Sequence, residues 1–405
     1  MNILPLREYK ETPLFLIILS ICFSFYYVDL GFALKPFMLL SAVLFVLSVK
    51  TFVTHSLFKY EIALLCYFAY YCTTGIFAKY PAASLRFIFG VFLVIFCYFV
   101  IKYFMHLVSI NGIEKAIFIS GFIFNGLSVL LYILGILKVG YIGGNQIREL
   151  GVLMDRGFPR LIGLTSDPNI FCFYNFIFFF YYLTHLDKKG AKLGFLLTSA
   201  TMLFSLSRGG IISVVLGLLL MFITLSLSKK IKMIVGVGFS VVALNLFVKI
   251  LFKIDFIQLI LERFMNGDAG SGRIDIWEKG LALLGNYPFF GVGIGNYRPH
   301  VIAEYGNAIY MHNTYMEALV EGGFIGLFLY SLIFILVFIT YFKNKSKLND
   351  KGYLIFTFTA VAFMMSTYSF MVNEIFFLVL ALIWRYLYEA QSSIKQSRSR
   401  RIRCP

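Results

Sequence analysis

Three polar segments of an otherwise apolar chain carry residues that could do chemistry. Arg208 lies in SLSRGG at 205–210, Arg273 in SGRIDIW at 271–277, and His312 in MHNTYMEALVEGG at 311–323. The rigid guanidinium group of arginine donates paired hydrogen bonds that match two oxygens of a phosphate. Histidine has a pKa near neutral pH and can act as a general base. These residues predict an anion-binding site beside a proton acceptor.

The neighbours of the two arginines fit this interpretation. Gly209 and Gly210 would let another group approach the backbone beside Arg208. Arg273 lies at the start of a predicted helix, where backbone N–H groups also attract anions. One face of that helix carries Ile274, Trp277, Leu281 and Leu284, and an outer-leaflet position would explain it without catalysis. For each arginine, simple pairing with a nearby carboxylate stays an open alternative.

The segment after His312 adds further candidates. Asn313 is adjacent, and Glu317 and Glu321 share one face of the predicted helix at four-residue spacing. A lone histidine is often structural, but His312 is one of five in the chain and stands at the mouth of a predicted span. The nearby GVGIGNY at 291–297 does not match the dinucleotide-binding pattern GxGxxG. We interpret its glycines as tight turns.

The composition identifies the environment in which these residues must be positioned. The 405 residues are 60% hydrophobic and only 14% charged, which excludes a soluble domain. Apolar windows of membrane-spanning length predict an all-α, polytopic membrane protein whose single transmembrane domain, 1–405, contains about twelve spans. These spans lie near 13–33, 36–54, 58–78, 84–105, 114–137, 168–186, 191–207, 209–228, 231–251, 315–342, 352–371 and 373–390.

The basic residues predict the orientation. Placing both termini in the cytoplasm puts most of the 36 lysines and arginines, and the basic tail 391–405, on the inner side. The net charge of +16 then reflects topology and gives no reason to expect nucleic acid. The segment 252–313 becomes a large periplasmic loop. Lysine prevails inside, whereas arginine leads outside, at Arg86, Arg148, Arg156, Arg160, Arg208, Arg263, Arg273 and Arg298.

One boundary decides whether Arg208 faces the periplasm. The turn at 207–210 separates two predicted spans, but 191–228 could instead be one broken helix or a re-entrant pair. In the first case Arg208 opens outward with the other arginines.

The order of the motifs carries a family resemblance. SLSRGG, SGRIDIW, GVGIGNY and HNTYMEALVEGGFIG, arranged around a large outer loop, resemble the O-antigen ligase and surface-polysaccharide (Wzy-type) polymerase family of bacterial inner membranes. PRLIGLTSDPNIF at 159–171 is similar to a family element that enters a transmembrane helix. The resemblance covers roughly 155–340. Its most specific part is the spacing from His312 and Asn313 to Gly323 and Gly326, whereas the first five spans match only in character.

The resemblance implies a GT-C-like glycosyltransferase that uses an undecaprenyl-diphosphate-linked glycan as donor, inverts the sugar carbon and needs neither metal nor cofactor. Arg208, Arg273 and His312 match the essential residues of the family, and the resemblance speaks less clearly for Arg160, Asp167 and Asn169. Chemically, the arginines, with Arg160 and Asn313 in support, would stabilise the leaving diphosphate, and His312 would activate the acceptor hydroxyl. Glu317 and Glu321 are secondary candidates.

Two alternatives stay open at this point. The SDPN element and the acidic VEGG favour polymerisation of O-antigen or other surface-polysaccharide repeat units, but a ligase that joins the glycan to lipid A core or a protein shares the same motifs. A transporter is less favoured because charges cluster at span ends.

The expected partners are the lipid-linked donor, a glycan or lipid A core acceptor, membrane lipid and a chain-length regulator. The expected location is the inner membrane, with a periplasmic active site.

Overall fold

The computed structural model describes residues 11–29, 32–139, 147–155, 158–252, 255–265, 272–306, 310–348 and 351–402. Of the sequence-based candidates, Arg156 lies outside these residues, as do parts of the segments 252–313 and 391–405. The described chain forms two compact units. The first contains 1–116, 273–355 and 365–405, and the second contains 117–272 and 356–364.

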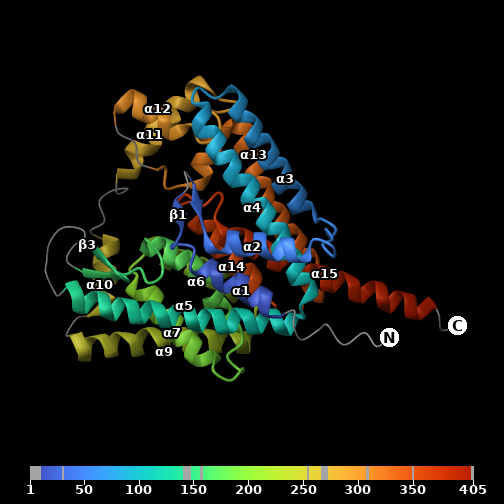
Figure 1. The fold of residues 1–405 in the computed structure, drawn as a ribbon. Helices are drawn as coiled ribbons and strands as arrows, with labels where there is room; N and C mark the ends of the chain where they lie inside the picture. The colour runs from blue at the N-terminus through green and yellow to red at the C-terminus, as the bar shows by residue number, and fades with distance from the viewer. Residues whose placement is uncertain are drawn as a thin grey trace. The chain divides into compact units, whose positions relative to one another are not determined.

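The first unit is built mainly from long helices. Its elements are α1 (Glu11–Cys22), β1 (Val28–Asp29), β2 (Ala33–Leu34), α2 (Pro36–Ser48), α3 (Lys59–Thr74), η1 (Gly75–Phe77), α4 (Pro81–Leu107), α11 (Arg273–Asn286), α12 (Tyr297–Tyr305), α13 (Thr314–Lys343), η3 (Lys345–Lys347) and α15 (Glu374–Ile402). Prolines begin α2 and α4 at the first helical turn, where the missing N–H group costs no hydrogen bond. Helix α3 packs along α13, and α15 packs along α4 (Figure 1).

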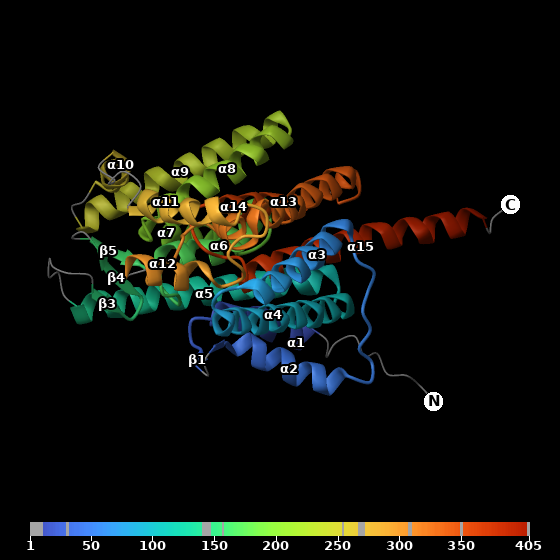
Figure 2. The same ribbon diagram turned by 90° about the horizontal axis from the view of Figure 1, so that it is seen from above.

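The second unit combines helices with a small sheet. Its elements are β3 (Ile147–Glu149), β4 (Val152–Asp155), β5 (Phe158–Leu161), α6 (Pro168–Thr184), α7 (Ala191–Phe204), α8 (Arg208–Thr224), α9 (Leu227–Phe252) and α10 (Phe256–Met265), with most of α5 (Ile110–Val139) and α14 (Tyr353–Met364). The strands form an antiparallel sheet in the order β3-β4-β5. Figure 2 shows α7 beside α6, and these two helices pack closely.

A buried polar cluster ties three helices of the second unit together. Asn125 on α5 and Asn175 on α6 exchange reciprocal amide hydrogen bonds of 2.9 Å. The hydroxyl of Thr201 on α7 donates to Asn125 at 2.6 Å. Hydrogen bonds of this kind join helices where no water is available to the amide groups.

The structure contains a helix in each of the twelve ranges that hydropathy predicts. Among the described residues, four helices are long and apolar enough to cross a membrane, namely Pro81–Leu107, Ile110–Val139, Thr314–Lys343 and Glu374–Ser392. Many large apolar side chains are exposed, for example Leu47 at 78%, Ile223 at 72% and Phe92 at 64%. Such surfaces require an apolar surrounding. The chain is therefore a helical membrane protein, and the crossing of all twelve helices stays a prediction.

Several helices differ in extent from the predicted spans. Helix α1 ends at Cys22 and is followed by the β1-β2 hairpin, whereas the predicted span extends to 33. Helix α14 ends at Met364, and irregular chain occupies 365–373 before α15 begins. The segment 138–167, which lies between two of the predicted spans, contains the three-stranded sheet. Short strands in polar segments carry too little hydrophobic alternation to be recognised from sequence.

Helix α13 is broken at Gly323, which has φ 67° and ψ −169°. The loop before α12 replaces the hydrogen bonds that the break removes. Val292 N donates to Val320 O at 2.9 Å, and Phe324 N donates to Pro288 O at 2.9 Å. Gly323 itself presses against the carbonyl of Phe289, because a Cβ atom built on it would lie 2.1 Å from that oxygen. The segment 287–296 therefore bridges the two parts of the broken helix, and we call it the splint loop.

Candidate functional site

Arg208 lies at the first position of α8, after a sharp turn that ends α7 at Phe204. Leu206 in this turn has a φ of 49°, which is rare for a residue with a side chain. The hydroxyl of Ser207 caps α8 by accepting from Gly210 N at 3.0 Å. The chain thus forms two separate helices here. The turn places Arg208 at the N-terminus of α8, where the helix dipole favours an anion.

Arg160 holds this turn in place. Its Nε donates to Ser205 O at 3.0 Å, and its Nη1 lies 3.2 Å from a carboxylate oxygen of Asp155. Burial lowers the pKa of Arg160, and the negative charges of Asp167 and Asp155 oppose that shift. Arg160 was predicted as a diphosphate ligand, but in this structure its guanidinium group is engaged in positioning the Arg208 turn.

Arg160→Lys should disturb the Arg208 turn while preserving the charge. A lysine can still pair with Asp155, but a compact ammonium group cannot replace a fork that contacts a carbonyl and a carboxylate together. We expect a fall in thermal stability of the purified protein, on the order of 1–3 kcal/mol in unfolding free energy, because the buried Ser205 carbonyl loses its donor. Arg148→Lys, at an exposed position on β3, is the control and should change little. Equal stability of the two variants would refute this role.

The N-terminus of α6 lies beside that of α8. Asp167 caps α6 by accepting from Asn169 N at 2.7 Å. The side-chain oxygen of Asn169 accepts from the hydroxyl of Ser207 at 2.6 Å. Asp167 and Asn169, both predicted as secondary site residues, therefore link two helix N-termini next to Arg208. Two converging positive helix ends strengthen the field that would attract an anion.

Arg273 likewise occupies the first position of a helix, α11, in the first unit. One turn later, Trp277 Nε1 donates to Met311 O at 2.9 Å, which ties α11 to the residue before His312. The amphipathic face predicted from sequence is divided, because Ile274 and Leu281 are exposed and Leu284 is buried. The packed face lies elsewhere, at Ile276, Gly280 and Leu283, around the cluster of Tyr297, Val301, Met311 and Val320. Figure 1 shows α11 and α12 beside α13.

His312 stands two residues before α13 and has a φ of 50°. A left-handed backbone at a histidine is uncommon and concentrates at functional sites. Asn313 follows as the helix cap, and its side-chain oxygen accepts from Tyr315 N at 3.0 Å and Met316 N at 3.1 Å. The cap fixes the chain next to His312. Asn313 was predicted to bind substrate. In this structure its side-chain oxygen caps the N-terminus of α13.

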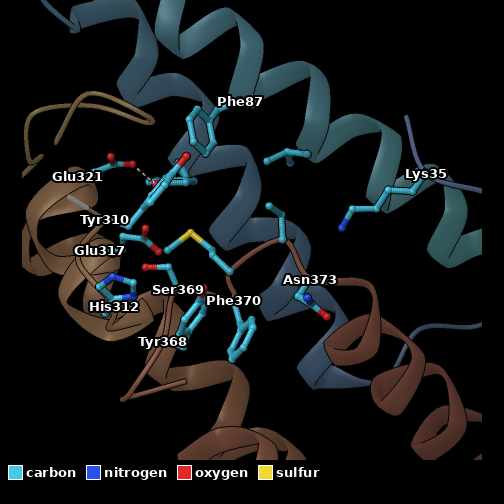
Figure 3. Close-up of a pocket in the computed structure, with 14 residues that line it drawn as sticks. Lys35, Phe87, Tyr310, His312, Glu317, Glu321, Tyr368, Ser369, Phe370 and Asn373 are labelled. Carbon is cyan, nitrogen blue, oxygen red and sulfur yellow. Dashed lines mark hydrogen bonds between the residues drawn. The ribbon is translucent and has the colours of Figure 1, made fainter. Parts of the chain in front are cut away.

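His312, Glu317 and Glu321 line one pocket of about 330 Å³ in the first unit. In the close-up of Figure 3 these three side chains gather at one end of the pocket. Arg273 is not among the residues that line it. Arg208, Arg160, Asp167 and Asn169 belong to the second unit. Apart from Arg273, the structure thus brings the predicted residues together in two groups, one in each unit.

The two glutamates have different surroundings. The carboxylate of Glu321 accepts from Gly295 N at 2.7 Å, from Tyr297 N at 3.0 Å and from the hydroxyl of Tyr71. Successive backbone N–H groups in a glycine-rich turn form a typical anion-binding nest, and here a side chain fills it. The GVGIGNY segment does form tight turns, as predicted, since Gly291, Gly293 and Gly295 have positive φ. Glu321 therefore holds the splint loop in place. Glu317 is the carboxyl group that lies beside His312 and Ser369 in the pocket.

Sequence reasoning missed most of the other pocket residues. Lys35 comes from the segment before α2, Tyr71 from α3 and Phe87 from α4. The irregular segment 365–373 supplies more, including Tyr368, Ser369, Phe370 and Asn373. A signal for this segment was available, since STYS at 366–369 interrupts an apolar range. Non-helical backbone at membrane depth is tolerated where it lines a cavity.

Thr314 ties the irregular segment to α13. Its backbone N–H donates to Met365 O at 2.7 Å, and its hydroxyl donates to Tyr368 O at 2.8 Å. The same hydroxyl accepts from Phe370 N at 2.8 Å. The residue two positions after His312 therefore shapes the pocket wall.

The fold and these two polar groups define a helical membrane protein with candidate chemistry at helix ends. Residues 193–331 match the family model described as O-antigen ligase. This range contains Arg208, Arg273 and His312, and it confirms the predicted resemblance to the O-antigen ligase and polymerase family over about a third of the chain. No curated protein matches the chain. The match supports a membrane enzyme of the O-antigen ligase and polymerase type.

Proposed function

We propose that the protein is a membrane glycosyltransferase that moves an undecaprenyl-diphosphate-linked oligosaccharide to an acceptor hydroxyl, polymerising repeat units of O-antigen or another surface polysaccharide. The observation that carries this proposal is the position of its three main residues. Arg208 and Arg273 each begin a helix, and His312 precedes one by two residues. A cation at a helix N-terminus opposes the helix dipole, so these arginines gain nothing for helix stability there. They do create strongly anion-attracting sites.

The proposed reaction replaces one bond at the anomeric carbon of the donor sugar with another. The acceptor oxygen forms a bond to the anomeric carbon of the donor sugar, and the bond from that carbon to the diphosphate oxygen breaks. His312 takes the acceptor proton, and the lipid diphosphate leaves with the electron pair. Guanidinium groups at Arg208 and Arg273 stabilise the charge that develops on the diphosphate, which requires no metal. Attack from the face opposite the leaving group inverts the sugar carbon.

The supporting residues act through these three. Arg160, Asp167 and Asn169 position the Arg208 turn through the hydrogen bonds and charges around it. Asn313 caps the helix next to His312. Glu317 lines the same pocket as His312, and we assign it an assisting role in proton transfer. We propose that both termini are cytoplasmic and that this chemistry takes place on the periplasmic side of the inner membrane.

A ligase is the second candidate, and the description of the matched family model favours it. Both enzymes would use the same donor and differ only in the acceptor. Deletion of the gene separates them. If the protein is a polymerase, the surface glycan should remain as single repeat units. Loss of all attached glycan with accumulation of lipid-linked polymer would identify a ligase, and an unchanged surface glycan would contradict both.

A transporter is the more distant candidate. It predicts that purified protein in proteoliposomes moves a lipid-linked sugar across the bilayer without forming a glycosidic bond. Such movement without any transfer would replace the proposal.

A further inference from the structure

The pocket beside His312 has the size and the lining of a small-molecule site. Its volume of about 330 Å³ lies at the lower end of the range for ligand pockets, roughly 300–1,000 Å³. Five aromatic rings contribute to its wall, from Tyr71, Phe87, Tyr310, Tyr368 and Phe370. Flat apolar surfaces with a few polar groups between them suit a sugar ring, which has apolar C–H faces and hydroxyl groups around its edge.

Polar groups stand at both ends of the pocket. His312, Glu317 and Ser369 lie at one end, and Lys35 and Asn373 lie toward the other (Figure 3). The side-chain oxygen of Asn373 accepts from Ile375 N at 2.9 Å as the cap of α15. The amide N–H₂ group of Asn373 and the ammonium group of Lys35 are hydrogen-bond donors at this end. A ligand between the two ends would meet a proton acceptor on one side and donors on the other.

The charges of the pocket disfavour an anionic ligand. Lys35 Nζ lies 2.7 Å from a carboxylate oxygen of Glu374, whose side chain is only 1% exposed. This pairing neutralises the lysine at close range. Glu317 and Glu321 add two carboxyl groups to the lining. A carboxylate on the ligand would lose its hydration and gain no unpaired lysine in return.

The wall at Tyr310 is held from outside the pocket. The guanidinium group of Arg298 on α12 lies over the Tyr310 ring, 4.9 Å from its centre, and donates to the tyrosine hydroxyl at 3.3 Å. Tyr310 is 52% exposed, and this contact restricts the motion of its ring. A preordered aromatic wall costs less conformational entropy on binding.

We propose that this pocket binds one uncharged sugar residue of the acceptor glycan, with its reacting hydroxyl toward His312 and Glu317 and another hydroxyl toward Lys35 and Asn373. The proposal rests on the proposed function and adds the chemical class of the acceptor. We assign the sugar to the acceptor because the pocket contains the proton acceptor of the reaction, whereas neither Arg208 nor Arg273 lines it.

The test is equilibrium binding to the full-length protein in nanodiscs, measured by saturation-transfer NMR without any donor. The probes are methyl glycosides of glucose, galactose, mannose, rhamnose, N-acetylglucosamine and N-acetylgalactosamine, together with the uronates of glucose, galactose and mannose. At least one neutral glycoside should bind, and its matched uronate should bind about tenfold more weakly or worse.

Tyr310→Ala should weaken binding of the neutral glycoside by about fivefold, because the ring no longer covers the apolar face of the sugar. The matched control is Tyr305→Ala. Tyr305 is exposed at the end of α12 and lies under Lys279 instead of lining the pocket. Failure of every neutral glycoside to bind, equal or tighter binding of the uronates, or equal effects of the two tyrosine variants would overturn the proposal.

A final arm separates the acceptor from the donor as source of the sugar. The binding measurement is repeated with saturating undecaprenyl-diphosphate-linked glycan present. Retained binding of the neutral glycoside supports the acceptor assignment, and its displacement overturns it. Because glycoside binding needs no transfer, binding without activity would contradict only the proposed function, and activity without binding would contradict only this inference.

Discussion

Gly323→Ala should disrupt the part of the first unit that surrounds the break in α13 and abolish any transfer activity. The break in α13 requires a φ of 67°, and an added Cβ would lie 2.1 Å from the Phe289 carbonyl oxygen. Neither the strain nor the overlap can relax without moving the splint loop, which also carries the nest for Glu321. We expect a destabilisation on the order of 3–5 kcal/mol, from overpacking and backbone strain together.

Thermal unfolding of the purified protein in detergent, followed by intrinsic fluorescence, measures this effect. Trp277 is a local reporter because its indole N–H is bonded to Met311 O. The control is Gly90→Ala in α4, where an added Cβ meets no atom within 4 Å. That variant should be neutral or slightly more stable, since alanine favours a helix. Comparable melting of Gly323→Ala and Gly90→Ala would show that the break is not essential.

Arg208→Ala should lower the rate of glycosyl transfer by about 10²–10³-fold, the cost of removing one donor that stabilises a developing anion. Arg208→Lys should be nearly as damaging if the two oxygens of a diphosphate are bound by the guanidinium fork, because lysine offers a point charge. Both variants should insert into the membrane, and their melting temperatures should be close to that of the parent protein. The measurement is initial rate with a defined lipid-linked donor.

The matched control is Arg148→Ala, which removes an exposed arginine from β3 in the same unit. It should retain the parent rate. Full activity of Arg208→Lys would mean that simple charge neutralisation suffices. Full activity of Arg208→Ala would remove this residue from the mechanism, and the same criterion applies to Arg273→Ala and His312→Ala.

The local features of the fold could be read from the sequence because they depend on neighbouring residues. Long apolar runs predict the helices, and the turn before Arg208 is set by the Ser207 cap and the adjacent glycines. The glycine turns of GVGIGNY were recognised for the same reason. The segment that these glycine turns contact could not be predicted. The contact with the broken α13 joins segments about thirty residues apart and depends on backbone groups that carry no sequence signal.

The candidate reactive residues stand out in the sequence, whereas the residues that form the pocket walls do not. Arginine and histidine are conspicuous in an apolar chain, whereas Tyr71 and Phe87 look like ordinary residues of a membrane span. The different roles of Glu317 and Glu321 were also hidden. They share a helix face, but only the tertiary structure shows that Glu321 is used by the splint loop. The contacts of Arg160 were hidden in the same way, since its carbonyl and carboxylate partners lie on separate elements.

The most direct test of the account is transfer in vitro with purified protein, a defined undecaprenyl-diphosphate-linked donor and varied acceptors, each with and without a metal chelator. We predict that a new glycosidic bond forms at the expense of the lipid diphosphate linkage, that a lipid-linked repeat unit serves as acceptor, and that the chelator has no effect. The His312→Ala protein should form no product. Absence of any glycosidic bond with every acceptor, from protein that is folded and binds the donor, would contradict the central claim.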